Sequence, residues 1–159
     1  IGNTITNPIR KKLVEEYGQN SNFEFIAMDW YNVKSNKMGT PTKYISLEDH
    51  TKYKYLLDLP GRGWSARVKN LMFSQRPLFL VDREMYDYVY LKLKKYVHYI
   101  PVKADLSDLE AQYEWAESHP KEAENIAKNA LSFAKKNLYM HQVIDEYSMI
   151  LEDYIRNYK

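Results

Sequence analysis

The sequence predicts an α/β fold: a Rossmann-like parallel sheet with flanking helices and a helical C-terminal tail. In the middle of the chain, short apolar segments alternate with stretches of helical periodicity, in the order strand, helix, strand, helix, strand. Short links between such elements are typical of a parallel sheet. In the last third, apolar side chains recur at helical spacing. We expect one domain over residues 1–159, because this length can bury a core and no linker or repeat divides it.

The first part of the chain predicts a helix and a short strand. Asn7 can cap a helix whose apolar face continues to Gly18. Residues 23–28 alternate as a strand does, whereas residues 29–43 show no periodicity and predict a loop. A short helix is expected over residues 46–50.

The middle of the chain predicts the sheet. Residues 52–59 form a first strand, and a helix begins after it near Trp64. Residues 77–81 are short and apolar throughout, as expected of a strand buried on both faces. A helix over residues 85–96 and a strand over residues 97–102 complete the pattern.

The last third predicts helices. Residues 106–117 follow a capping candidate, and small side chains then share one helical face over residues 123–134. A further apolar face runs over residues 143–154.

The composition excludes several classes of function. A formal charge of +2 argues against a polybasic nucleic-acid binder. The chain has no cysteine, which excludes a disulfide scaffold, a thiolate zinc site and a cysteine nucleophile. The 4 histidines are scattered without a metal-ligand spacing, so we expect no metal. No apolar run could span a bilayer and no signal segment opens the chain, so we expect a cytoplasmic protein, or one peripheral to the inner membrane.

The turn after the first central strand is the best candidate for a binding site. Gly61 and Gly63 let the backbone approach a ligand at the carboxyl end of a parallel strand, where the next helix N-terminus favours a phosphate. Ser65 can add a hydroxyl donor, and Arg67 a planar group that matches two phosphate oxygens. Arg10 opposes its helix dipole, which hints at an anionic ligand. The alternative is a purely structural turn with both arginines solvated.

Other polar residues give weaker signals. Asp82 and Glu84 follow the strand over residues 77–81, where α/β proteins place ligand-facing carboxylates, but they are equally good helix caps. His98 lies among apolar neighbours, and we interpret it as a hydrogen-bonded structural residue.

Three blocks of sequence, in this order and spacing, resemble glycosyltransferase family 90. They are KYKYLL at residues 52–57, GWSAR at 63–67 and HYIPVKADLSDL at 98–109. The resemblance runs from about Gly2 to the final helix and includes the helix around residues 123–127. That family includes bacterial lipopolysaccharide-modifying transferases, fungal capsule-associated xylosyltransferases and animal protein O-glucosyltransferases.

The resemblance implies the donor-binding domain of a GT-B-type enzyme, which moves a sugar from a UDP-sugar to a hydroxyl with inversion and without a metal. It also implies which residues bind the nucleotide diphosphate. Carried over by position, they are Arg10, Arg62, Gly63, Trp64, Ser65, Ala66 and Arg67. Thr4 and Thr6 line the turn before Arg10 in this reading. As UDP leaves, Arg67 and the helix N–H groups would stabilise the charge that develops on the diphosphate.

The chain departs from the family pattern at two points. The family has an Arg-Gly pair before the first helix, whereas Gly2 here follows Ile1. The family's catalytic base is a carboxylate in an amino-terminal half that this chain does not contain, so we assign no general base among Asp58, Asp82 and Glu84. We therefore expect a fragment of a larger two-domain enzyme, inactive without its N-terminal domain.

Taken together, the sequence predicts the UDP-sugar-binding half of a bacterial glycosyltransferase of lipopolysaccharide biosynthesis. It would transfer a hexose or pentose to lipopolysaccharide or a related surface glycan, with the UDP-sugar as donor substrate and no cofactor. The main alternative is a non-catalytic α/β module that binds a partner protein through its Tyr-rich helices. A third reading, a single-stranded nucleic-acid binder, is disfavoured by the charge of +2.

Overall fold

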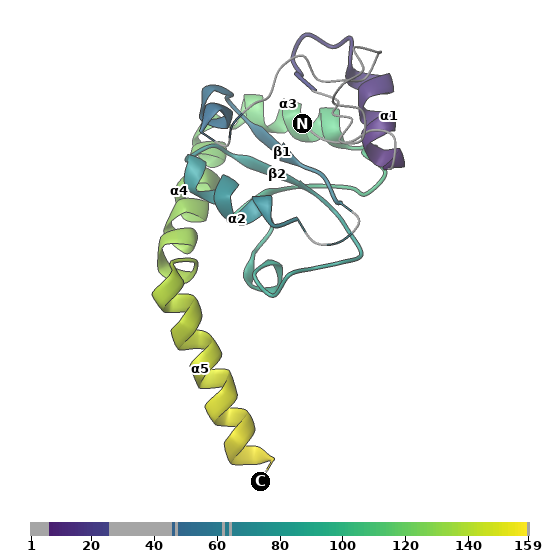
Figure 1. The fold of residues 1–159 in the computed structure, drawn as a ribbon. Coiled ribbons are helices and arrows are strands. Elements are labelled where there is room, and N and C mark those ends of the chain that lie inside the picture. Colours follow the sequence, from purple (N-terminus) through teal and green to yellow (C-terminus); the bar gives the residue numbers. More distant parts are fainter. Residues whose placement is uncertain (1–6, 26–45, 47, 62, 64, 159) are drawn as a thin grey trace.

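A three-stranded parallel sheet lies at the centre of the described residues, which in this computed structural model are 7–25, 46, 48–61, 63 and 65–158. Figure 1 shows the sheet with helices on both sides. In chain order the elements are α1 (Pro8–Tyr17), η1 (Asp49–Lys52), β1 (Leu56–Asp58), α2 (Arg67–Leu71), η2 (Met72–Ser74), β2 (Leu78–Val81), η3 (Tyr90–Lys92), β3 (Ile100–Val102), α3 (Leu109–Ser118), α4 (Pro120–Asn137) and α5 (Met140–Asn157). The predicted α/β class with a parallel sheet is confirmed.

The strands lie in the order β1-β2-β3, so each strand pairs with its successor in the chain. Leu56 is paired with Leu78, and Phe79 with Ile100. Because side chains alternate along a strand, each strand sends apolar residues to both faces of the sheet. All four residues of β2 are buried, as predicted for the segment over residues 77–81.

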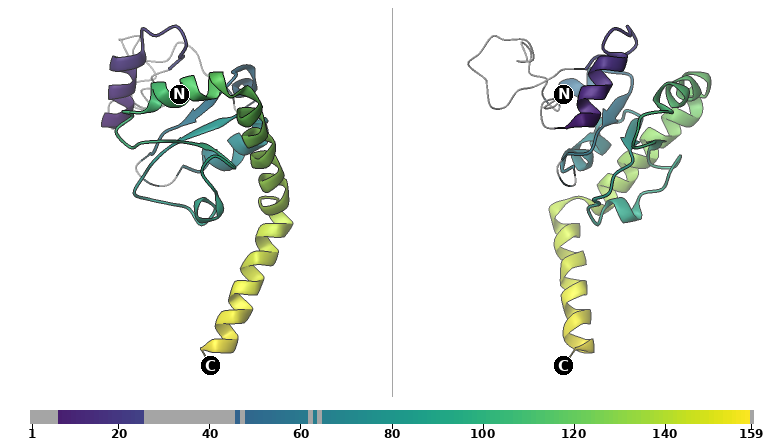
Figure 2. Two further views of the ribbon diagram at one scale, coloured as in Figure 1. Left: turned by 180° about the vertical axis from the view of Figure 1, so that it is seen from behind. Right: turned by 90° about the vertical axis from the view of Figure 1, so that its right-hand side faces the viewer.

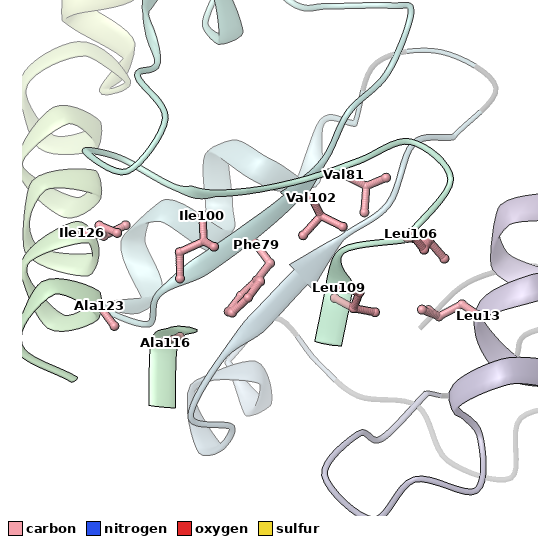
Figure 3. Packing of buried hydrophobic residues seen from close by; sticks show 10 residues of the cluster. All are labelled: Leu13, Phe79, Val81, Ile100, Val102, Leu106, Leu109, Ala116, Ala123 and Ile126. Carbon is pink, nitrogen blue, oxygen red and sulfur yellow. The ribbon is translucent and has the colours of Figure 1, made fainter. Parts of the chain in front are cut away.

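One face of the sheet is covered by α1, α3 and the start of α4. In Figure 3, Phe79 lies in the middle of this cluster, between the α4 residues Ala123 and Ile126 on one side and Leu13 and Leu109 on the other. The buried members are Leu13, Phe79, Val81, Ile100, Val102, Leu106, Leu109, Ala116, Ala123 and Ile126.

The opposite face is covered by α2, η2 and the second half of α4. Val68, Leu71 and Met72 pack there against strand residues, together with Ala130 and Ala134. Alanines let a helix approach closely, so the predicted small-residue face is the one by which α4 joins the core. The helix α4 thus contributes buried residues to both hydrophobic clusters.

Three central elements differ from the prediction. The strand predicted over residues 97–102 is shorter, because only Ile100–Val102 form β3. The helix predicted over residues 85–96 is wrong: this stretch contains η3, turns and an isolated bridge between Lys95 and Tyr99. Tyr and Val are weak helix formers, and Met85 and Leu91, which a helix would have to bury, are 56% and 79% exposed. The strand predicted over residues 52–59 is shorter: η1 ends at Lys52, residues 53–55 are bends, and only Leu56–Asp58 pair with β2.

The elements predicted in the first third of the chain are confirmed in part. Asn7 caps α1, since its Oδ1 accepts hydrogen bonds from the backbone N–H groups of Ile9 and Arg10 at 3.1 and 3.2 Å. The short helix expected over residues 46–50 is confirmed only in part, because the 3-10 helix η1 covers Asp49–Lys52 and overlaps the predicted range at two residues. In the predicted strand over residues 23–28, the described part, residues 23–25, is not a strand, and the rest lies outside the described residues, as does the predicted loop.

Helix α5 extends from the end of α4 away from the sheet, as Figures 1 and 2 show. No residue of α5 is buried. It is tied to the body by an ion pair between Lys92 and Glu146 and by contact of the Tyr88 and Tyr147 rings. No helix in the described part of the chain is long and apolar enough to cross a membrane.

Candidate functional site

Strand β1 ends in a buried carboxylate that holds two residues of the predicted site. Asp58 is 0% exposed, and its Oδ1 accepts hydrogen bonds from the Ser65 hydroxyl at 2.9 Å and from Arg67 Nη2 and Nε at 2.8 and 3.1 Å. The turn after β1 therefore returns to the end of the strand and fixes the first residue of α2 there. This is the carboxyl edge of the sheet, where α/β folds bind ligands.

The second carboxylate oxygen of Asp58 accepts a hydrogen bond from Arg83, which lies two residues after β2. Arg83 Nη1 lies 3.0 Å from Asp58 Oδ2 and also donates to the hydroxyl of Tyr90 at 2.8 Å. Its Nη2 donates to the backbone oxygen of Asp58, and its Nε to that of Val81. Burial raises the pKa of the Tyr90 hydroxyl, which therefore stays protonated. Arg83 and Tyr90 join the two strands and the segment after them into one network.

The third cation at this edge is Arg10, on the first turn of α1. The side-chain amide of Asn7 donates to the backbone oxygen of Pro60 at 3.0 Å, which ties the start of α1 to the turn after β1. The pKa of Arg10 is lowered by burial and by the charge of Arg67, against the opposite effect of Asp58. Arg10 Nε is buried and has no hydrogen-bond partner among the described residues. A buried donor normally has an acceptor, so this geometry suits an anionic ligand.

Arg10 and Arg67 both line a pocket of about 260 Å³ beside β1. Most of the other described residues around it are apolar or aromatic. The aromatic ones are Phe23, Phe25, Tyr53, Tyr55, Phe79 and Tyr113. The pocket thus combines cationic groups, which bind phosphate oxygens, with rings, which stack on planar ligands.

The structure brings part of the predicted site together. Ser65 and Arg67 both contact Asp58, and Arg10 lines the same pocket as Arg67, whereas Arg62 and Trp64 lie outside the described residues. Ala66 is the N-cap of α2 and provides no side-chain cap. The helix α2 has only 5 residues, so its dipole is weaker than that of the longer helix that the sequence predicts.

The two glycines of the turn are not required by tight packing among the described residues. A Cβ at Gly63 would lie 3.9 Å from Met85 Sδ, and one at Gly61 would lie 3.8 Å from the Gly63 oxygen, both ordinary contact distances. Neither glycine has a left-handed φ. Among the described residues, a methyl group would therefore fit at either position.

Sequence reasoning missed Arg83 and Tyr90. The signal for Arg83 is an arginine two residues after a fully buried strand, a place where a charge needs a partner. Asp58 was one of three candidate carboxylates. The structure makes it the counterion of two arginines rather than an available base.

The remaining polar candidates lie apart from this network or touch it only at its rim. Asp82 is exposed and accepts from the Tyr86 hydroxyl at 2.7 Å, a bond that lowers the pKa of its carboxyl. His98 lies in the turn before β3, where its Nδ1 accepts from the Lys94 N–H and its ring contacts Phe133. Across the described residues, no group of three His, Asp or Glu side chains is placed to hold a metal ion.

Comparison with known proteins shows the family. A sequence model of Glycosyl transferase family 90 matches residues 1–159. Protein O-glucosyltransferase 1 of Rattus norvegicus is 34% identical over 125 residues, which cover 79% of this chain and 32% of that protein. Protein O-glucosyltransferase 2 of Danio rerio is 32% identical over 134 residues, or 84% of this chain and 26% of that protein. The O-glucosyltransferase rumi homolog of Aedes aegypti is 32% identical over 127 residues, which cover 79% of this chain and 32% of that protein.

The chain spans no more than about a third of the length of these curated relatives. All three come from animals and are named O-glucosyltransferases, so the expected bacterial and lipopolysaccharide assignment gains no support from them. The match over the whole chain and the identities of 32–34% agree with the three sequence blocks. This protein belongs to glycosyltransferase family 90.

Proposed function

We propose that this chain is the donor-binding part of a GT-B-type glycosyltransferase that transfers a hexose or pentose from a UDP-sugar to a hydroxyl group. One observation carries the proposal: Arg10 and Arg67 lie together at the carboxyl edge of a parallel sheet, and Arg10 Nε is a buried donor without an acceptor among the described residues. A diphosphate supplies both the negative charge and the acceptor oxygens that these groups need. Membership of the family supports sugar transfer as the reaction.

The chemistry that these residues can supply is charge stabilisation. When the bond between the sugar and the diphosphate breaks, negative charge develops on the leaving UDP. Arg67, held in place by Asp58, and Arg10 would face that charge from fixed positions, which lowers the barrier without reorganisation at the moment of reaction. In this proposal the two guanidinium groups take the role of a metal ion. The turn residues Arg62, Gly63, Trp64, Ser65 and Ala66 stay predicted contacts of the same diphosphate.

The general base is proposed to come from the part of the enzyme that this chain does not include. Asp58 is 0% exposed and ion-paired to Arg67 and Arg83, so it cannot reach an acceptor hydroxyl. The acceptor is proposed to be a hydroxyl of a protein, as the names of the animal relatives suggest. A lipopolysaccharide or related glycan is the second acceptor class.

Isothermal titration calorimetry with UDP tests the proposal. The parent should bind UDP, and Arg67→Ala should weaken binding at least about tenfold, since a charge-assisted contact contributes about 1.5–3 kcal/mol. Arg156→Ala, on exposed α5, is the matched control for loss of one positive charge and should bind like the parent. Addition of a chelator should leave the affinity unchanged. Absence of heat with the parent, or equal binding by Arg67→Ala, would refute the proposal.

The sugar donor and the acceptor have to be identified with a longer enzyme that includes the proposed general base. A panel of UDP-glucose, UDP-galactose and UDP-xylose, offered with either a protein or a lipopolysaccharide acceptor, separates the possibilities by product mass. Transfer to the protein alone supports the acceptor proposed here, and transfer to the lipopolysaccharide alone contradicts it.

A further inference from the structure

Two arginines contact one buried carboxylate, and a third arginine shares a pocket with one of them. Arg67 and Arg83 are ion-paired to Asp58 at 2.8 and 3.0 Å, and Arg10 lines the same pocket as Arg67. Like charges this close repel one another, and the repulsion is stronger where burial excludes water. The cluster therefore needs an anion of its own to keep the arginines together before any ligand arrives.

The two oxygens of Asp58 have different partners. Oδ1 accepts from Ser65 and from two nitrogens of Arg67, whereas Oδ2 accepts from Arg83. Because Arg67 donates through both Nε and Nη2, its planar guanidinium is held along one edge and cannot turn without breaking two hydrogen bonds. The side chain of Arg67 is still 23% exposed and lines the pocket, so the group is fixed and also reachable.

Arg83 holds the carboxylate itself in place. Its side chain is 3% exposed, and it donates to Oδ2 and the backbone oxygen of Asp58, to Val81 and to Tyr90. Two of these partners lie on β1 and β2, the rigid part of the fold. The orientation of Arg67 is thus determined through Asp58 by the sheet, and a group built on strands is positioned more precisely than one on a loop.

We infer that Asp58, supported by Arg83, is a positioning residue for donor binding: it fixes Arg67 in the orientation that receives the diphosphate of a nucleotide sugar. The inference rests on the proposed function. An arginine loses side-chain freedom when it binds a ligand, and an arginine that is already anchored has less to lose. Three arginines against one carboxylate also leave an excess of positive charge for the diphosphate.

If Asp58 acted only through its charge, it would weaken the binding of UDP instead of strengthening it. A carboxylate beside a diphosphate repels it, so removal of that carboxylate should tighten the binding of UDP. Positioning predicts weaker binding, because Arg67 loses its anchor. The sign of the change in affinity therefore separates the two explanations.

The test is a double-mutant cycle on UDP affinity, with Asp58→Asn and Arg67→Ala singly and together. We expect Asp58→Asn to weaken UDP binding about tenfold in the parent and less than about twofold in the Arg67→Ala background. Asp82→Asn removes the same charge from the same edge of the sheet, but among the described residues Asp82 bonds to the Arg83 N–H and the Tyr86 hydroxyl and not to Arg67. It serves as the matched control and should bind UDP no more weakly than the parent.

Each outcome of this cycle either supports or overturns the inference that Asp58 positions Arg67. Tighter or unchanged UDP binding by Asp58→Asn overturns it while leaving the proposed function intact, and so does an equal loss in both backgrounds. Absence of UDP binding by the parent overturns the proposed function and this inference with it. If circular dichroism shows that Asp58→Asn is unfolded, Arg83→Lys replaces it in the cycle. This variant keeps the charge but cannot make both hydrogen bonds to Asp58, and we expect a loss of about threefold that again disappears with Arg67→Ala.

Discussion

The buried ion pair between Asp58 and Arg83 gives a prediction about stability that does not depend on any ligand. In Arg83→Met, the apolar part of the side chain is retained and the guanidinium is removed. The donors to Asp58 Oδ2, to the Asp58 and Val81 backbone oxygens and to the Tyr90 hydroxyl are all lost. Because the side chains of Arg83 and Asp58 are 3% and 0% exposed, water cannot readily replace these donors.

The expected loss in the free energy of unfolding depends on the interactions that Asp58 keeps in the variant. Breaking a buried ion pair by removing one partner costs about 3–5 kcal/mol. Asp58 keeps its hydrogen bonds from Ser65 and Arg67, so its charge is still compensated and the low end of this range applies. We therefore predict that Arg83→Met lowers the free energy of unfolding by about 3 kcal/mol, a loss that a domain with a stability of about 5–15 kcal/mol survives.

An exposed ion pair provides the comparison. Lys54 and Glu117 are closer, at 2.5 Å, but their side chains are 63% and 37% exposed. Lys54→Met should therefore cost less than about 1 kcal/mol. Urea unfolding followed by far-ultraviolet circular dichroism measures both variants, and the dependence on urea should keep its slope. A loss below about 1 kcal/mol for Arg83→Met, or equal losses for the two variants, would show that burial does not determine the strength of this network.

Three further outcomes are expected. Ile100→Ala should destabilise by about 3 kcal/mol in urea unfolding and Ile150→Ala by less than about 0.5 kcal/mol, because the two side chains are 0% and 57% exposed. Gln75→Gly should raise the free energy of unfolding by about 0.5–1 kcal/mol, because Gln75 has a φ of 58° at an exposed helix end; an unchanged or lower value contradicts this. Burial, with the charge of Lys94, lowers the pKa of His98 below its ordinary 6.5, so the unfolded chain takes up the proton first. The thermal midpoint should therefore fall as the pH drops through about 6.5, and less steeply in His98→Asn; parallel pH profiles contradict this.

The sequence predicts those elements whose signal is local. The cap at Asn7 marks the start of α1, and the apolar run over residues 77–81 marks β2, because the cause of each lies within a few residues. The same holds for α4 and α5, whose helical periodicity extends over several turns. The placement of Arg10 and Arg67 in one site came from the resemblance to the family and agrees with their positions in the fold.

What the sequence does not predict depends on partners far away in the chain. Arg83 meets Asp58 across 25 positions, and no local pattern shows that two charges will be buried together. The segment over residues 85–96 also depends on partners outside it: its only helix is the short η3, and the Tyr90 hydroxyl accepts a hydrogen bond from Arg83, which is itself paired with Asp58. Tertiary contacts therefore override the local preference there.

The position of α4 in both hydrophobic clusters has a consequence for synthesis of the protein. All three strands precede this helix in the chain, but one face of the sheet lacks Ala123 and Ile126, and the other lacks Ala130 and Ala134, until it is made. A nascent chain that ends before α4 therefore leaves part of each face of the sheet exposed to chaperones and to aggregation. We expect this domain to resist protease during synthesis only after α4 has left the ribosome.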